Sequence, residues 1–138
     1  MAGFIEKERQ VSQGIEILVL DDEPVVCERL EDYLKKKGMS VETFTESTRA
    51  LDRLKEKSFD VIVTDIKMEG PSGIDVLSRV KQDASNSEVI LITGYGSFET
   101  LREAEAIGAY DYIPKPFKVE ELFKKIEKAA ARARKRSK

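Results

Sequence analysis

The sequence predicts one α/β domain with a doubly wound parallel sheet of five strands, a (βα)5 arrangement. A short apolar run followed by ten or more residues at helical spacing occurs five times, which is typical of alternating strands and helices. Two of the runs, FDVIVT and EVILIT, have apolar centres, as strands covered on both faces do. A chain of 138 residues suits one such domain.

The apolar runs define the expected strands. They are predicted at residues 15–20, 40–44, 59–64, 88–93 and 109–113. Residues 1–14 hold scattered charges and are expected to form an N-terminal extension. The folded domain is expected over 15–130, and 131–138 would be a basic C-terminal tail or the start of a linker.

Capping residues mark the ends of the expected helices. Pro24 is tolerated in the first turn of a helix, and Gly38 would end this first one. Ser47 is expected to cap a helix over 49–57. The other helices are expected over 74–81, opened by Ser72 or Gly73, from Ser97 to Ile107, and from about Val119 onward.

Two compositional features narrow the function. The absence of histidine excludes histidine-dependent nucleophilic triads, imidazole metal ligands and phosphohistidine carriers. The single cysteine, Cys27, cannot form an intrachain disulfide and is expected to be a small apolar helix residue in a reducing compartment. No apolar run reaches the ~18 residues of a membrane span, so we expect a cytoplasmic protein without a membrane partner.

The charge is unevenly distributed. Residues 124–138 carry eight Lys and Arg against one Glu, so this segment bears +7 and the preceding residues bear −9. Since nucleic-acid phosphates favour a broad basic face, we expect no direct nucleic-acid binding by the domain itself. The basic residues would instead suit the last turns of a helix.

Polar residues follow the apolar runs at the expected carboxyl ends of the strands. Asp21 and Asp22 follow the first strand, Asp65 the third and Thr93 the fourth, while Lys115 comes after the fifth. In the flavodoxin-like strand order 2-1-3-4-5, the first and third strands are neighbours at the switch point where ligands bind. We therefore expect these five side chains to face one cleft.

Three clustered carboxylates repel one another, and Lys115 supplies only one compensating charge. A hard divalent cation is the natural counter-ion, and Mg²⁺ fits best because it takes one or two carboxylates, keeps waters and accepts a phosphoryl oxygen. The sequence thus predicts a site for phosphate and Mg²⁺.

Four motifs in this order carry a family resemblance: LVLDDEP at 18–24, VTDIKM at 63–68, ILITGYGS at 90–97 and AYDYIPKPF at 109–117. Together they resemble the receiver domain of two-component response regulators, most closely those of NtrC-like transcription activators, over nearly all of residues 15–130. The resemblance implies a signalling domain that catalyses only its own phosphorylation and dephosphorylation.

The resemblance implies a role for each matching residue at the acidic end of the sheet. Asp65 matches the residue that accepts a phosphoryl group from a sensor histidine kinase. Asp22 matches the direct acidic Mg²⁺ ligand, Asp21 the one that acts largely through water, and Lys67 would lend its backbone carbonyl to the metal.

It also implies a switch. Thr93 matches the hydroxyl that moves toward the phosphoryl group, Tyr112 the aromatic side chain that turns inward behind it, and Lys115 the ammonium paired with the phosphoryl oxygens. The Lys115-Pro116 bond resembles the family's cis peptide. The surface of the fourth helix, fifth strand and fifth helix is expected to dimerise on phosphorylation or to contact an output domain or effector.

The chain departs from the family pattern at MEGPSG, residues 68–73, where Glu69 stands in place of the usual proline and Pro71 comes later. The turn after Asp65 is therefore expected to differ in shape.

Other interpretations are weighed against this one. Asp21 and Asp22 could belong to an acidic first helical turn, Thr93 and Lys115 taken singly could be ordinary surface groups, and Tyr112 could be core packing. Among functions, a Mg²⁺-dependent phosphatase of the haloacid-dehalogenase type lacks its D-x-D motif here, and a flavin- or nucleotide-binding module lacks its glycine-rich phosphate loop. An unphosphorylated docking unit is disfavoured by the complete acceptor set.

Overall fold

A central parallel sheet of five strands organises the chain. The computed structural model describes residues 14–83, 85–94 and 98–136. The strands are β1 (Glu16–Leu20), β2 (Ser40–Phe44), β3 (Val61–Asp65), β4 (Glu88–Thr93) and β5 (Asp111–Pro114). Their order in the sheet is β2-β1-β3-β4-β5 and every neighbouring pair is parallel, as the sequence predicts.

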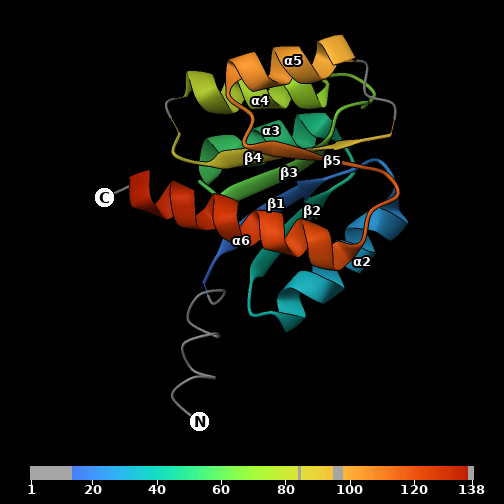
Figure 1. Ribbon diagram of the computed structural model, residues 1–138, viewed down its shortest axis with the longest axis vertical. Coiled ribbons are helices and arrows are strands. Elements are labelled where there is room, and N and C mark those ends of the chain that lie inside the picture. Colours follow the sequence, from blue (N-terminus) through green and yellow to red (C-terminus); the bar gives the residue numbers. More distant parts are fainter. Residues whose placement is uncertain (1–13, 84, 95–97, 137–138) are drawn as a thin grey trace.

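Helices cover both faces of this sheet (Figure 1). They are α2 (Pro24–Lys36), α3 (Ser47–Glu56), α4 (Gly73–Gln82), α5 (Phe98–Ile107) and α6 (Val119–Arg136). Helices α2 and α6 lie on one face, and α3, α4 and α5 on the other. This confirms the doubly wound (βα)5 fold.

Each face of the sheet has its own apolar core, because successive side chains of a strand point to opposite faces. Ile17, Val19 and Ile90 pack with α2 and α6, whereas Leu18 and Leu91 pack with the helices opposite. All five residues of β3 are buried, as expected for a strand in the middle of a covered sheet.

Two local expectations were wrong. Ser47 does not cap α3 but is its first residue, and the N-cap is Glu46, which makes no side-chain capping bond. Strand β5 is shifted toward the carboxyl end of its expected range and includes Pro114. Ser72, by contrast, caps α4 in a reciprocal capping box with Asp75. Ser97 lies outside the described residues.

Helix α6 continues past residue 130 to Arg136, so the expected domain boundary falls inside a helix. Ala133 is buried against the body. The Arg132 guanidinium lies 3.0 Å from the buried carboxylate of Glu88, and that of Arg134 lies 3.3 Å from Asp60. Within the described residues, no helix is both long and apolar enough to cross a bilayer.

Candidate functional site

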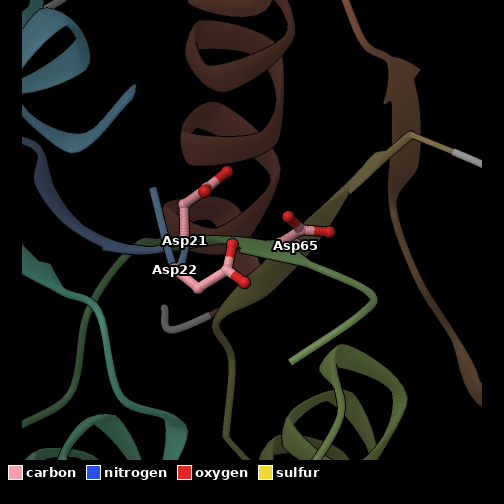
Figure 2. A group of neighbouring side chains, drawn as sticks. All are labelled: Asp21, Asp22 and Asp65. Carbon is pink, nitrogen blue, oxygen red and sulfur yellow. The ribbon is translucent and has the colours of Figure 1, made fainter. Parts of the chain in front are cut away.

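The carboxyl ends of β1 and β3 bring three aspartates together (Figure 2). Strands β1 and β3 are direct neighbours, with Leu20 paired to Thr64, so Asp21 and Asp22, which follow β1, meet Asp65, the last residue of β3, at one edge. One carboxylate oxygen from each of Asp21, Asp22 and Asp65 lies within 4.8 Å of the other two. The predicted acidic cluster is therefore present.

The three carboxylates differ in exposure. Asp21 is fully buried, Asp65 is 7% exposed and Asp22 is open to solvent. Burial raises the pKa of Asp21 above its ordinary value of 3.8, against the opposing effects of the Glu23 N–H and Lys115. The Glu23 amide donates a 2.8 Å hydrogen bond to Asp21 Oδ1, which fixes the orientation of this carboxylate.

Lys115 reaches this cluster from the segment after β5. Its Nζ lies 3.0 Å from Asp21 Oδ2, 3.0 Å from Asp65 Oδ2 and 3.7 Å from a Glu23 oxygen. Burial disfavours the ammonium form, but the two aspartates outweigh this effect and raise the pKa of Lys115 above 10.5. The bond from Lys115 to Pro116 is cis, as the resemblance implies.

Asp22, Asp65, Lys67, Thr93 and Lys115 line one cleft of about 810 Å³. Asp21 was also expected to face this cleft, but it is fully buried and is not one of the lining residues. Thr93 is buried at the end of β4, and its carbonyl accepts a 2.7 Å hydrogen bond from the Lys115 amide. The Lys67 amide donates to Asp65 Oδ1 at 3.2 Å. Asp65 is thus held through both carboxylate oxygens.

Tyr112 lies apart from this group. Its side chain on β5 is 47% exposed, whereas Tyr110 packs against the α2 and α6 core. In this structure the Tyr112 ring therefore faces outward, and the inward position that the resemblance implies would need a movement of the side chain. Phe98, 74% exposed at the start of α5, is another large apolar side chain that the fold leaves in contact with solvent.

Two contributors to the site were missed from the sequence. The Cys27 thiol donates to the carbonyl of Asp21 at 3.4 Å, and burial followed by the charge of Asp21 raises the pKa of this thiol to about 11. A Cβ at Gly73 would lie 2.3 Å from the carbonyl oxygen of Asp65, so only glycine fits. Glycine is needed here because the backbone at Gly73 passes close to that of Asp65 and Ile66. Hydrophobic periodicity carries no signal of such a close approach.

The donor set fits a hard divalent cation. Every side chain of the cluster offers carboxylate oxygen, and one ammonium group contacts two of the three acids, which leaves excess negative charge. Mg²⁺ takes oxygen ligands, binds through one or two carboxylates and keeps several of its waters, and the exposed Asp22 leaves one side of the cluster open to water. The residues present could therefore hold Mg²⁺.

The fold and site together define a doubly wound α/β protein with an acidic, lysine-paired cleft at its topological switch point. Residues 17–127 match the response regulator receiver domain family. The chain belongs to this family.

Curated relatives are transcription regulators. The chain is 34% identical over 117 residues to the transcriptional regulatory protein FixJ of Bradyrhizobium diazoefficiens, covering 85% of this chain and 57% of that protein. It is 33% identical over 119 residues to the DNA-binding transcriptional regulator NtrC of Escherichia coli K12, covering 86% and 25%. The chain thus spans about half of the one relative and a quarter of the other.

Solved structures agree with this assignment. A receiver domain protein from Clostridium thermocellum superposes with a TM-score of 0.81 at 34% identity, covering 87% of this chain and 97% of that one. The beryllofluoride-activated NtrC4 receiver domain dimer gives a TM-score of 0.80, also at 34% identity, covering 86% and 98%. The match to receiver domains extends over nearly the whole compared chains.

Proposed function

We propose that Asp65 accepts a phosphoryl group from the phosphohistidine of a sensor kinase and that this controls an output surface of the domain. The observation that carries the proposal is the 3.0 Å pairing of Asp65 with Lys115 beside the carboxylates of Asp21 and Asp22. Membership of the receiver domain family supports it.

The proposed reaction needs no general base, because a carboxylate is already a nucleophile. An Asp65 carboxylate oxygen forms a bond to phosphorus, and the bond from phosphorus to the donor imidazole nitrogen breaks with its electron pair leaving on the donor. Lys115 and the Thr93 hydroxyl would pair with the phosphoryl oxygens. The domain would catalyse this transfer and the later hydrolysis on itself alone.

Asp21, Asp22, Asp65 and the Lys67 carbonyl would hold the Mg²⁺ ion. When bound, Mg²⁺ neutralises the negative charge that gathers where phosphate meets carboxylate. Without a cation the acids would repel an incoming phosphoryl group, and Lys115 supplies only one positive charge. Asp21 is buried and would lie on the inner side of the metal site, whereas Asp22 is exposed and would lie on its solvent side.

The output surface would be the face formed by α5, β5 and α6. Phe98 and Tyr112 expose apolar rings on α5 and β5, and covering them would favour association. Dimerisation on phosphorylation is the proposed readout, and an output domain or effector protein is the proposed partner because the curated relatives extend well beyond the matched region. A cytoplasmic location, expected from the lone cysteine, belongs to the same proposal.

The test is incubation of the purified chain with acetyl phosphate and MgCl₂, followed by intact-mass measurement. We expect one phosphoryl group per chain, stable in acid and lost in alkali, and no adduct without Mg²⁺. Asp65→Asn should abolish the adduct, whereas Asp52→Asn, on the exposed side of α3, should keep it. An adduct that survives in Asp65→Asn would refute the assignment, and turnover of a generic phosphomonoester would favour a phosphatase instead.

A further inference from the structure

The loop from Ile66 to Ser72 joins the phosphoryl-accepting end of β3 to α4. Lys67, whose carbonyl is the proposed metal ligand, lies within it. Since this inference concerns how the loop serves metal-dependent phosphorylation, it rests on the proposed function.

Backbone contacts hold both ends of this loop. The Ile66 amide donates to the Ile92 carbonyl on β4 at 3.1 Å, and the Gly73 amide donates to the Ile66 carbonyl at 2.9 Å. Ser72 then begins α4 through its capping box. These bonds place Asp65 and the start of α4 but do not reach the middle of the loop.

A side chain from another helix holds the middle. The Ser47 hydroxyl, at the first position of α3, donates to the carbonyl oxygen of Glu69 at 3.2 Å. Ser47 is 1% exposed, so its hydroxyl has no bulk water as an alternative partner. The next residue, Gly70, has φ +78°, and its backbone turns beside Ser47.

Pro71 fixes the backbone toward the end of this loop, but neither Glu69 nor Gly70 fixes it in the middle. A proline fixes φ by its ring, whereas Glu69 leaves the backbone free to rotate. Glu69 precedes a glycine, the residue with the greatest backbone freedom. An outside anchor would therefore decide how well the loop keeps one conformation.

We propose that Ser47 is a positioning residue for metal-dependent phosphorylation. Its hydrogen bond to the Glu69 carbonyl holds the loop in the conformation that presents the Lys67 carbonyl, two residues earlier, to the metal. Among the described residues, those that line the cleft do not include Ser47, and its hydroxyl donates to the loop, so it would act through the loop. Without this bond, part of the free energy of metal binding is needed to order the loop, so the affinity for the metal falls.

The test compares Ser47→Ala with Thr48→Ala, its exposed neighbour in the same helical turn. Calorimetry with MgCl₂ measures affinity, amide hydrogen exchange of the metal-free protein measures loop order, and acetyl phosphate measures phosphorylation. In Ser47→Ala we expect the Mg²⁺ dissociation constant to rise about three- to tenfold, the phosphorylation rate at saturating Mg²⁺ to stay within about twofold, and amides of residues 66–72 to exchange faster. Thr48→Ala should match the wild type in all three.

Two further results keep the inference separate from the proposed function. A wild-type chain that neither binds Mg²⁺ nor takes up phosphate refutes the proposed function and this inference with it. A wild-type chain that does both, while Ser47→Ala binds Mg²⁺ as Thr48→Ala does, refutes this inference alone. If Ser47→Ala fails to fold, Ser47→Cys keeps the side-chain size with a weaker donor, and it should show raised loop exchange and weakened Mg²⁺ binding; wild-type values would refute the inference.

Discussion

The Nζ of Lys115 lies 3.0 Å from Oδ2 of Asp65, although fifty positions separate these residues in the chain. The same nitrogen lies 3.0 Å from Asp21, so one cation links the ends of β1 and β3 to the segment after β5. Because the Asp21 carboxylate is fully buried, the pairing bears on stability as well as on the proposed phosphorylation.

Lys115→Ala should destabilise the metal-free protein by about 1–3 kcal/mol, because it leaves the carboxylates of Asp21 and Asp65 without their ammonium partner. Mg²⁺ should restore more stability to this variant than it adds to the wild type, since the site is then more negative. Urea unfolding with EDTA and with MgCl₂ measures both effects. Lys118→Ala, at an exposed position nearby, is the control, and equal Mg²⁺ effects in all three proteins would contradict the prediction.

Asp21→Asn should stabilise the metal-free protein at pH 7 by on the order of 1 kcal/mol, because the neutral amide avoids both the cost of burying a charge and the repulsion from Asp65. Burial raises the pKa of Asp21, so ionised Asp21 lowers the stability of the folded wild type. As the pH falls through this raised pKa toward 3.8, the folded state takes up the proton and the advantage of the variant disappears. Urea unfolding across this range, with Asp52→Asn as control, measures the difference, and an advantage that grows in acid would argue against this account.

Gly73→Ala should destabilise the fold by about 1–3 kcal/mol, because the new Cβ would lie 2.3 Å from the carbonyl oxygen of Asp65 and the backbone would have to move. Gly94→Ala is a matched control at the end of β4. A Cβ there meets nothing within 4 Å, so its effect should stay within about 0.5 kcal/mol. Thermal unfolding of both variants decides the matter, and similar losses at the two positions would rule out the steric explanation.

Ending the chain after Ala130 should lower the free energy of unfolding by about 2–3 kcal/mol, because it removes Arg132, an ion-pair partner of the buried Glu88, together with the buried Ala133. Lys128→Ala, exposed on the same helix, should change stability little. Chemical denaturation of the shortened chain and of this variant gives the comparison. Unchanged stability on truncation would instead support a folded domain that ends near residue 130.

The fold could be predicted because the local sequence patterns correspond to helices and strands that are present in the tertiary structure. Strands β3 and β4 could be predicted because strands in a sheet covered on both faces have uninterrupted apolar runs. Asp21, Asp22 and Asp65 could be placed together because parallel strands all end at the same edge. Such inferences need only periodicity and chain direction, which lie entirely in the order of the residues.

Other features depended on contacts between distant segments. The sequence predicts that Ser47 caps α3. In the structure its hydroxyl instead donates to the Glu69 carbonyl, because α3 begins beside the loop after β3. Likewise the outward ring of Tyr112 and the close crossing at Gly73 follow from how elements meet in space. The sequence by itself determined the order of strands and helices and which acids share a strand end. Only the tertiary structure decided which carboxylate is buried and which side chains brace the site, because burial and hydrogen bonding between elements are properties of packing.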